Sequence, residues 1–167
     1  MSITKLSINS FRNLAATNNS FDEKLNLIIG DNGSGKSSLL ESIFFLGHGK
    51  SFRTTRIENL ISKEHDAFVV SARDDKSNQL GVHRYRDGLF NIKINVDSKF
   101  RLSDLAKNIA VQVITPETFR LFFGGPKERR KFVDLGLFHV EHQYADLWRD
   151  FKKVLIQRNG CLKNKIA

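Results

Sequence analysis

Eight residues near the start of the chain have the types and spacing of an anion-binding loop. Residues 30–37 read Gly-Asp-Asn-Gly-Ser-Gly-Lys-Ser, which fits the pattern G-x-x-x-x-G-K-[S/T] of phosphate-binding loops. The glycines let the backbone curl, so that several N–H groups point at one anion. Lys36 adds a positive charge for the β- and γ-phosphates of a nucleotide, and the Ser37 hydroxyl can ligate Mg²⁺. A glycine-rich turn without a ligand would need neither side chain.

The segments on either side of the loop have the order that this motif requires. Residues 25–29 form a short apolar run that predicts a buried strand, and residues 37–46 carry apolar side chains at helical spacing. A helix beginning near Lys36 would add its free N–H groups and the positive end of its dipole. We expect nucleotide contacts from Gly30, Asp31, Asn32, Gly33, Ser34, Gly35, Lys36, Ser37 and Ser38.

The remaining pattern predicts an α/β fold. Asp87-Gly88 is a strong hairpin signal, because glycine accepts a positive φ without steric cost. After Gly-Gly-Pro at 124–126 every segment has helical character. In order, we predict a strand at 3–10, a β-meander at 67–72, 80–86 and 89–96, a short helix at 103–107 and a strand at 110–114.

The change of character near residues 123–126 predicts two parts. Residues 1–123 would form the α/β part, and residues 124–167 would begin a helical part. About forty residues are too few for a helical domain with its own core. The last helix should carry one apolar face, formed by Tyr144, Leu147, Trp148, Phe151, Val154 and Leu155. The helices should therefore need partners that these residues do not supply.

Composition limits the class of protein. The chain has 167 residues, with 27 Lys and Arg against 18 Asp and Glu, and so a net charge of +9. No apolar run reaches the roughly 20 residues that span a bilayer, so we expect no membrane protein. The single cysteine, Cys161, and the absence of a signal-peptide pattern at the start favour a cytoplasmic location. The positive balance favours a polyanionic partner such as nucleic acid.

Basic residues outside the loop give further candidates. Arg12, in Phe-Arg-Asn-Leu after the first strand, is either a second nucleotide contact or a solvated loop residue. Lys50, Arg53 and Arg56 follow the loop's helix and are either contacts to a nucleic-acid backbone or a solvated loop. Arg129 is another possible DNA contact, but it belongs to a basic run on a predicted helix, where adjacent side chains point about 100° apart and cannot all share one patch.

The sequence shows no clear match to the acidic motif that a nucleotide hydrolase needs. Such enzymes need an acidic residue after an apolar strand, the Walker B site, to hold Mg²⁺ and position water. The run at 131–134, Lys-Phe-Val-Asp, is too short and lies in a helical context. We therefore name no catalytic residue and expect this chain alone to hydrolyse ATP very slowly or not at all.

Several blocks together resemble the RecF family of bacterial recombination mediators. The long block Leu-Asn-Leu-Ile-Ile-Gly-Asp-Asn-Gly-Ser-Gly-Lys-Ser-Ser-Leu-Leu-Glu-Ser-Ile at 25–43 is similar to the family's Walker A region. Further matches, in family order, are Gly-Lys-Ser-Phe-Arg-Thr at 49–54, Val-Gln-Val-Ile-Thr-Pro-Glu at 111–117, Gly-Gly-Pro-Lys-Glu-Arg-Arg-Lys-Phe-Val-Asp at 124–134 and Gln-Arg-Asn at 157–159.

The resemblance implies an ABC-type ATPase lobe, related to Rad50 and SMC heads, with a mixed sheet and an antiparallel meander. It implies ATP and Mg²⁺ as cofactors and ATP-dependent homodimerisation on DNA, with a preference for duplex or gapped DNA and binding to single-stranded DNA as well. It also implies work with RecO and RecR in loading RecA, within DNA replication, recombination, repair and the SOS response. Arg12 and Asn13 would contact the nucleotide, and Gln112 would be a Q-loop residue near the γ-phosphate. Family members are longer, so we expect this chain to be an N-terminal portion without Walker B and signature motifs.

Two other functions stay open at this point. The charge and the basic clusters fit a DNA- or partner-binding module in which nucleotide binding is incidental. A different small P-loop protein, such as a nucleotide kinase, fits the loop alone. The later RecF-like blocks argue against the kinase.

Overall fold

The computed structural model describes residues 2–97, 102–119, 123–141 and 143–163. Contacts along the chain divide it into two compact units, Met1–Val113 and Ile114–Ala167. This division comes earlier than the domain boundary at 123/124, which stays a prediction. The first unit contains the phosphate-binding loop and the whole sheet, and the second is helical.

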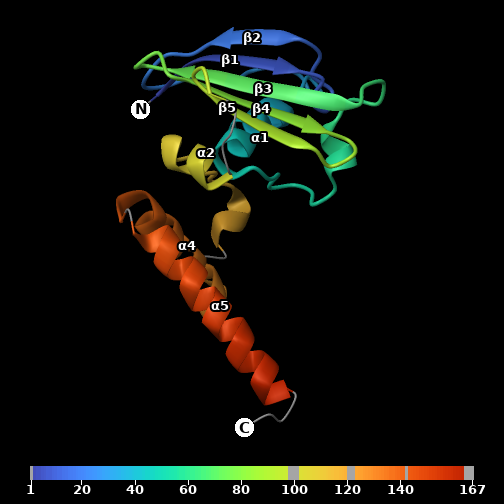
Figure 1. The fold of residues 1–167 in the computed structure, drawn as a ribbon. Helices are drawn as coiled ribbons and strands as arrows, with labels where there is room; N and C mark the ends of the chain where they lie inside the picture. Colours follow the sequence, from blue (N-terminus) through green and yellow to red (C-terminus); the bar gives the residue numbers. More distant parts are fainter. Residues whose placement is uncertain (1, 98–101, 120–122, 142, 164–167) are drawn as a thin grey trace. The chain divides into compact units, whose positions relative to one another are not determined.

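Five strands of the first unit form one sheet in the order β2-β1-β3-β4-β5 (Figure 1). Every neighbouring pair is antiparallel, so the described residues confirm the α/β class and the meander but contain no parallel pair of a mixed sheet. Buried and exposed side chains alternate along the strands, as the period-two pattern requires. The strands are β1 (Ile3–Asn9), β2 (Thr17–Ser20), β3 (Ala67–Asp74), β4 (Gln79–Tyr85) and β5 (Phe90–Ile94).

The turn between β4 and β5 confirms the Asp87-Gly88 prediction. Gly88 has a φ of 100°, which a side chain would disfavour. The Asp87 carboxylate accepts a hydrogen bond of 2.9 Å from the backbone N–H of Leu89. The Tyr85 N–H donates to the Leu89 carbonyl at 3.0 Å, which closes the hairpin and fixes its register.

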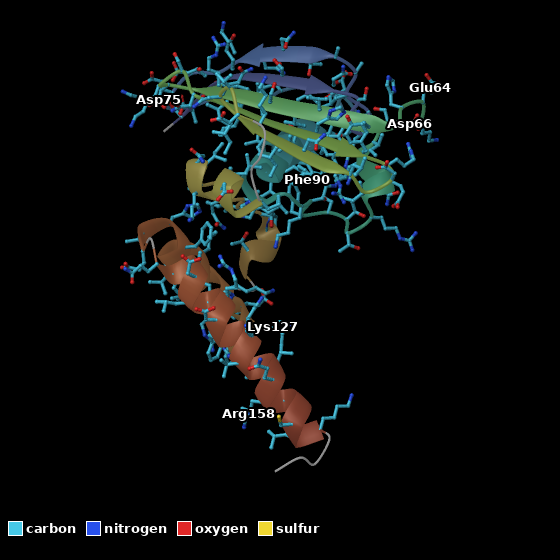
Figure 2. The ribbon with its side chains drawn as sticks, in the orientation of Figure 1. Glu64, Asp66, Asp75, Phe90, Lys127 and Arg158 are labelled. Atoms are coloured by element: carbon cyan, nitrogen blue, oxygen red, sulfur yellow. The ribbon has the colours of Figure 1, made fainter. Side chains whose placement is uncertain are left out.

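One face of the sheet packs against α1 (Lys36–His48) and α2 (Leu102–Asn108). Phe11, Phe45 and Phe68 are almost fully buried between the layers, and their rings meet edge to face with centroids 4.9–6.4 Å apart. Figure 2 shows Phe90 of β5 on the same side as α1, where its ring centroid lies 6.4 Å from that of Phe45. Burial of these rings holds α1, and thus the phosphate-binding loop, against the sheet.

Two predicted strands are wrong. Residues 25–29 and 110–114 pair with no strand of the described chain. Leu25, Leu27 and Ile29 are 81–83% exposed, and Ile114 is 85% exposed. A strand needs a neighbouring strand that satisfies its backbone N–H and C=O groups. An apolar run predicts one strand but not the partner with which it would pair. The structure instead adds β2 and two 3₁₀ turns, η1 (Ile57–Leu60) and η2 (Pro116–Phe119), which the pattern did not indicate.

The second unit contains α4 (Pro126–Val140) and α5 (Tyr144–Lys163). Both were predicted as helices, and Pro126 occupies the first turn, where its missing N–H costs nothing. Neither helix has a buried residue, and the predicted apolar face of α5 is exposed, with Phe151 at 54% and Val154 at 61%. The helices of the described residues include none that is both long and apolar enough to cross a bilayer.

One side-chain contact between α4 and α5 gives a pH-dependent prediction. The Tyr144 hydroxyl donates a 2.6 Å hydrogen bond to the Asp134 carboxylate, and this bond to an anion raises the pKa of Tyr144. A raised pKa means that the folded state holds the phenol proton more tightly than the unfolded state. The stabilisation is therefore complete below the ordinary value near 10 and is lost as the pH rises through the raised pKa. Absorbance titration should show one of the chain's two tyrosines ionising late, and Tyr144→Phe should remove that step. Two tyrosines with ordinary pKa values would contradict the contact.

Candidate nucleotide-binding site

Residues 30–37 curl directly into the N-terminus of α1. Gly35 is the N-cap with φ 98° and ψ 4°, and Gly33 has φ 85°, so both use backbone conformations that favour glycine. The helix has no acidic residue in its first turn. Its unpaired N–H groups and dipole therefore present an uncancelled positive end at the loop.

The loop forms part of a pocket of about 820 Å³. This volume is within the range of small-molecule sites. Four basic side chains and one acidic side chain are among the lining residues, which favours an anionic ligand. The lining is Arg12, Asn13, Asn32, Gly33, Gly35, Lys36, Ser37, Ser38, Arg53, Glu58, Asn59, Ile61 and Lys63.

The Lys36 ammonium is bound to its own loop. Its Nζ donates hydrogen bonds of 2.7 Å to the backbone carbonyls of Gly30 and Asp31. Both hydrogen bonds are exposed to solvent, where a net contribution of only about 1 kcal/mol is expected from each, so a ligand can replace them easily. The Lys36 ammonium, which we predict to bind a phosphate, therefore lies at the pocket.

Asn13 ties the loop to the segment after β1. Its Nδ2 donates to the Gly33 carbonyl at 2.9 Å, and its Oδ1 accepts from the Ser38 hydroxyl at 2.7 Å. The segment itself is a tight turn in which Phe11 and Leu14 exchange backbone hydrogen bonds of 3.1 and 2.8 Å. Asn13 thus lines the pocket, and the two ends of its amide bind the loop and the first turn of α1. Its contact with a nucleotide stays a prediction.

A buried carboxylate in α1 was missed by sequence reasoning. The Glu41 side chain is fully buried and binds the Arg12 guanidinium in a bidentate pair, with Nη2 of Arg12 2.8 Å from Oε1. The Ser51 hydroxyl also donates to Glu41, and Nη1 of Arg53 lies 3.6 Å from Oε2. A single anion thus gathers two arginines from separate segments at one wall of the pocket. Helical spacing gave no signal for it, because Glu41 falls on the side of the predicted helix opposite most of its apolar residues.

Four further predicted residues, Lys50, Arg56, Gln112 and Arg129, lie outside the pocket lining. Arg56 lies next to Arg53 in an adjoining hollow, and Lys50 is exposed directly after α1. Gln112 is exposed and lies outside the described lining of the pocket; its side-chain amide donates to the Val113 carbonyl at 3.3 Å. Arg129 belongs to the other unit, where it donates to the Gly124 carbonyl at 2.9 Å. Their roles stay predictions.

Two loop glycines give a matched test of this geometry. A Cβ on Gly35 would lie 2.5 Å from Cδ2 of Leu14, whereas a Cβ on Gly33 would meet nothing within 4 Å. Both residues have positive φ, so alanine at either position costs about 1 kcal/mol of backbone strain. Gly35→Ala should lower the free energy of unfolding by about 1 kcal/mol more than Gly33→Ala, because the end of the Leu14 side chain must also move. Urea denaturation measures both variants, and an equal loss for Gly33→Ala would contradict the close approach.

The sequence of the chain is similar to a known family and to named proteins. A family model described as the RecF/RecN/SMC N terminal domain matches residues 2–119. The protein named DNA replication and repair protein RecF from Colwellia psychrerythraea is 54% identical over 99% of this chain and 44% of its own length. The protein of the same name from Pseudoalteromonas translucida is 49% identical over 99% of this chain and 46% of its own length. The chain thus spans about half the length of these relatives.

Solved structures described as RecF have a fold similar to that of this chain. A structure described as the recombination mediator protein RecF-ATPrS in the RecFOR pathway superposes with a TM-score of 0.85 at 28% identity, over 97% of this chain and 45% of that chain. The structure described as RecF-ATP reaches a TM-score of 0.83 at 28% identity, over 98% of this chain and 45% of that chain.

Proposed function

The chain belongs to the RecF/RecN/SMC N terminal domain family, and on that premise we propose that it is the ATP-binding part of a DNA repair protein. The observation that carries the proposal is the loop at 30–37, which presents Lys36 and the free end of α1 to a basic pocket. Relatives that match nearly the whole chain are named DNA replication and repair proteins, and one similar structure is described as RecF-ATP.

In this proposal the loop wraps the triphosphate. The backbone N–H groups of the loop and of the first turn of α1 face the phosphates, and Lys36 exchanges its two carbonyl partners for phosphate oxygens. Ser37, the second residue of α1, holds Mg²⁺ through its hydroxyl. The oxygen and nitrogen chemistry of these residues fits both ligands. Arg12 and Arg53, held by Glu41, add positive charge at the wall of the pocket.

Titration of the chain with a fluorescent ATP analogue tests this role. Saturable binding that ATP displaces and AMP does not is the expected result, because the contacts are to the β- and γ-phosphates. Omission of Mg²⁺ should weaken binding in the wild type but not in Ser37→Ala. Absence of displaceable binding would refute the proposal.

The wider role is proposed for proteins of the relatives' full length, about half of which this chain spans. There the ATP-bound form dimerises on gapped DNA and acts with RecO and RecR to load RecA. The name RecFOR pathway, given with the similar structures, supports this assignment. The binding lobe described above would supply the nucleotide contacts of such a dimer.

A DNA-binding module with incidental nucleotide binding is the second candidate, favoured by the net charge of +9. DNA affinity measured at several salt concentrations, with and without ATP, separates the two. A steep salt dependence that ATP leaves unchanged favours the DNA-binding module. Contacts between basic side chains and DNA phosphates release counterions whether or not a nucleotide is bound. A change of affinity with ATP favours coupled binding.

A further inference from the structure

The face of the sheet opposite α1 carries a second hollow, which shares no lining residue with the pocket at the phosphate-binding loop. It has a volume of about 450 Å³ and lies over Gly81 in β4, between β3 and β5. We propose that this hollow binds a base of single-stranded nucleic acid. The proposal rests on the nucleic-acid part of the proposed function and is independent of the ATP site.

The charge of this face suits a polyanion. Because side chains alternate along a strand, the positions that point away from α1 can be read from the register. They include three permanent cations and, among the described strand residues, no carboxylate. The outward residues are Lys5, Ser7 and Asn9 of β1, Asn18 and Ser20 of β2, Val69, Ser71 and Arg73 of β3, Gln79, Gly81, His83 and Tyr85 of β4, and Asn91 and Lys93 of β5.

Acidic residues near this sheet lie at the ends of its strands. Figure 2 shows Asp75 at one end of the sheet and Asp66 at the other, where they follow and precede β3. The middle of the face, where the hollow lies, is therefore neutral or positive. A negatively charged ligand is attracted there and repelled from the ends.

The hollow exists because Gly81 has no side chain. A Cβ at this position would lie 3.7 Å from Cβ of Ser71 and 3.9 Å from Cβ of Lys93, which are ordinary contact distances. Outward residues on one strand repeat at about 6.6–6.8 Å, so the next side chain along β4, His83, forms one wall. The opening therefore leaves room for a planar ring against His83.

That wall is part of an aromatic stack. The rings of His83 and Tyr85 lie parallel within 28°, with centroids 4.1 Å apart. In the order Gly81, His83, Tyr85 along one face, the histidine ring stands between the tyrosine and the hollow. A base over Gly81 would extend this stack from two rings to three. Stacking of this kind is sequence-tolerant, because every base has a π-face.

The other lining groups supply polar contacts. Asn91 is the cross-strand partner of His83, and Ser71 and Lys93 flank Gly81 on its two sides. An amide and a hydroxyl can hydrogen-bond the edges of a base, and the lysine can contact a phosphate. Arg73 continues the basic surface along β3. Bases of a duplex are stacked on each other and cannot enter, so the geometry selects single strands.

Binding of a labelled oligodeoxythymidylate, followed by fluorescence anisotropy, tests the site. Gly81→Val fills the hollow with a residue that suits a strand and should weaken single-strand binding about tenfold, which is the effect of losing one stacked base. Ser7→Val places the same side chain on the same rung of the sheet but outside the hollow, and should leave binding unchanged. Affinity for a duplex of equal length should not change in either variant.

The outcomes separate this site from the wider proposal. Single-strand binding by the wild type that Gly81→Val leaves intact would overturn the hollow but keep DNA binding. Absence of single-strand binding by the wild type would overturn both, while ATP binding would stand. His83→Ala repeats the test without a change at glycine and should also weaken binding. Photocrosslinking with iodouracil-labelled strands should modify His83 or Tyr85, and crosslinks confined to other peptides would contradict the assignment.

Discussion

Replacing Lys36 by alanine is expected to weaken ATP binding by about 10- to 100-fold. A hydrogen bond to a charged group contributes about 1.5–3 kcal/mol, and each 1.4 kcal/mol is a factor of ten in affinity. Stability should change by less than about 1 kcal/mol, because the two bonds that Lys36 makes to its own loop are exposed. Calorimetric titration with Mg-ATP, together with a thermal melt, measures both quantities.

Lys63→Ala is the matched control. Lys63 lines the same pocket and has the same charge, but it lies outside the loop. Its removal should reduce ATP affinity only slightly, through the general field of the pocket. Equal losses for the two variants would show that charge alone, and not the geometry of the loop, binds the nucleotide.

Glu41→Ala should lower the free energy of unfolding by about 3–5 kcal/mol, which is the usual cost of breaking a buried ion pair from one side. Removal of the fully buried carboxylate leaves the Arg12 guanidinium, only 18% exposed, without its counter-charge. Ser51 loses its acceptor at the same time. Chemical denaturation monitored by circular dichroism gives the value.

Two further variants separate the ion pair from a general effect of losing a carboxylate. Glu64, which Figure 2 places on an exposed loop, should change stability by at most about 0.5 kcal/mol when replaced by alanine. The double variant of Glu41 and Arg12 to alanine should be less damaging than the sum of the single losses, by more than about 1 kcal/mol. Simple additivity would mean that the two side chains do not stabilise each other.

Local signals predicted the centre of the candidate site. The loop at 30–37 and α1 follow from spacing within a few residues, because glycine conformations and helix periodicity are short-range properties. The Asp87-Gly88 hairpin follows for the same reason. In these segments the residues that determine the backbone conformation lie within the segment itself, so a local sequence motif is enough to predict it.

Pairing between distant segments could not be predicted in the same way. Residues 25–29 have a stronger strand pattern than β2, whose sequence is Thr-Asn-Asn-Ser, and yet only β2 joins the sheet. β2 pairs because β1 presents a matching edge to it, from Ile8 opposite Thr17 to Lys5 opposite Ser20. Strand formation depends on such a neighbour more than on the intrinsic preference of the residues.

The positioning groups of the site were hidden for a related reason. The position of Arg12 in the chain left two roles open, and only the family resemblance implied a nucleotide contact; the structure adds that Glu41 holds its guanidinium. Glu41 and Arg12 are 29 residues apart, and Ser51 lies on a third segment. No spacing rule connects them, and only the packing of α1 against the turn after β1 brings them together.

The claim that residues 30–37 enclose the phosphates of ATP is tested most directly by amide chemical-shift mapping. Addition of Mg-ATP to the ¹⁵N-labelled chain should shift the N–H signals of Gly33, Gly35, Lys36 and Ser37 most, because these groups face the phosphates in the proposed complex. AMP should not reproduce these shifts. If the signals of the loop stay in place while ATP moves those of another surface, or moves none, the account is contradicted.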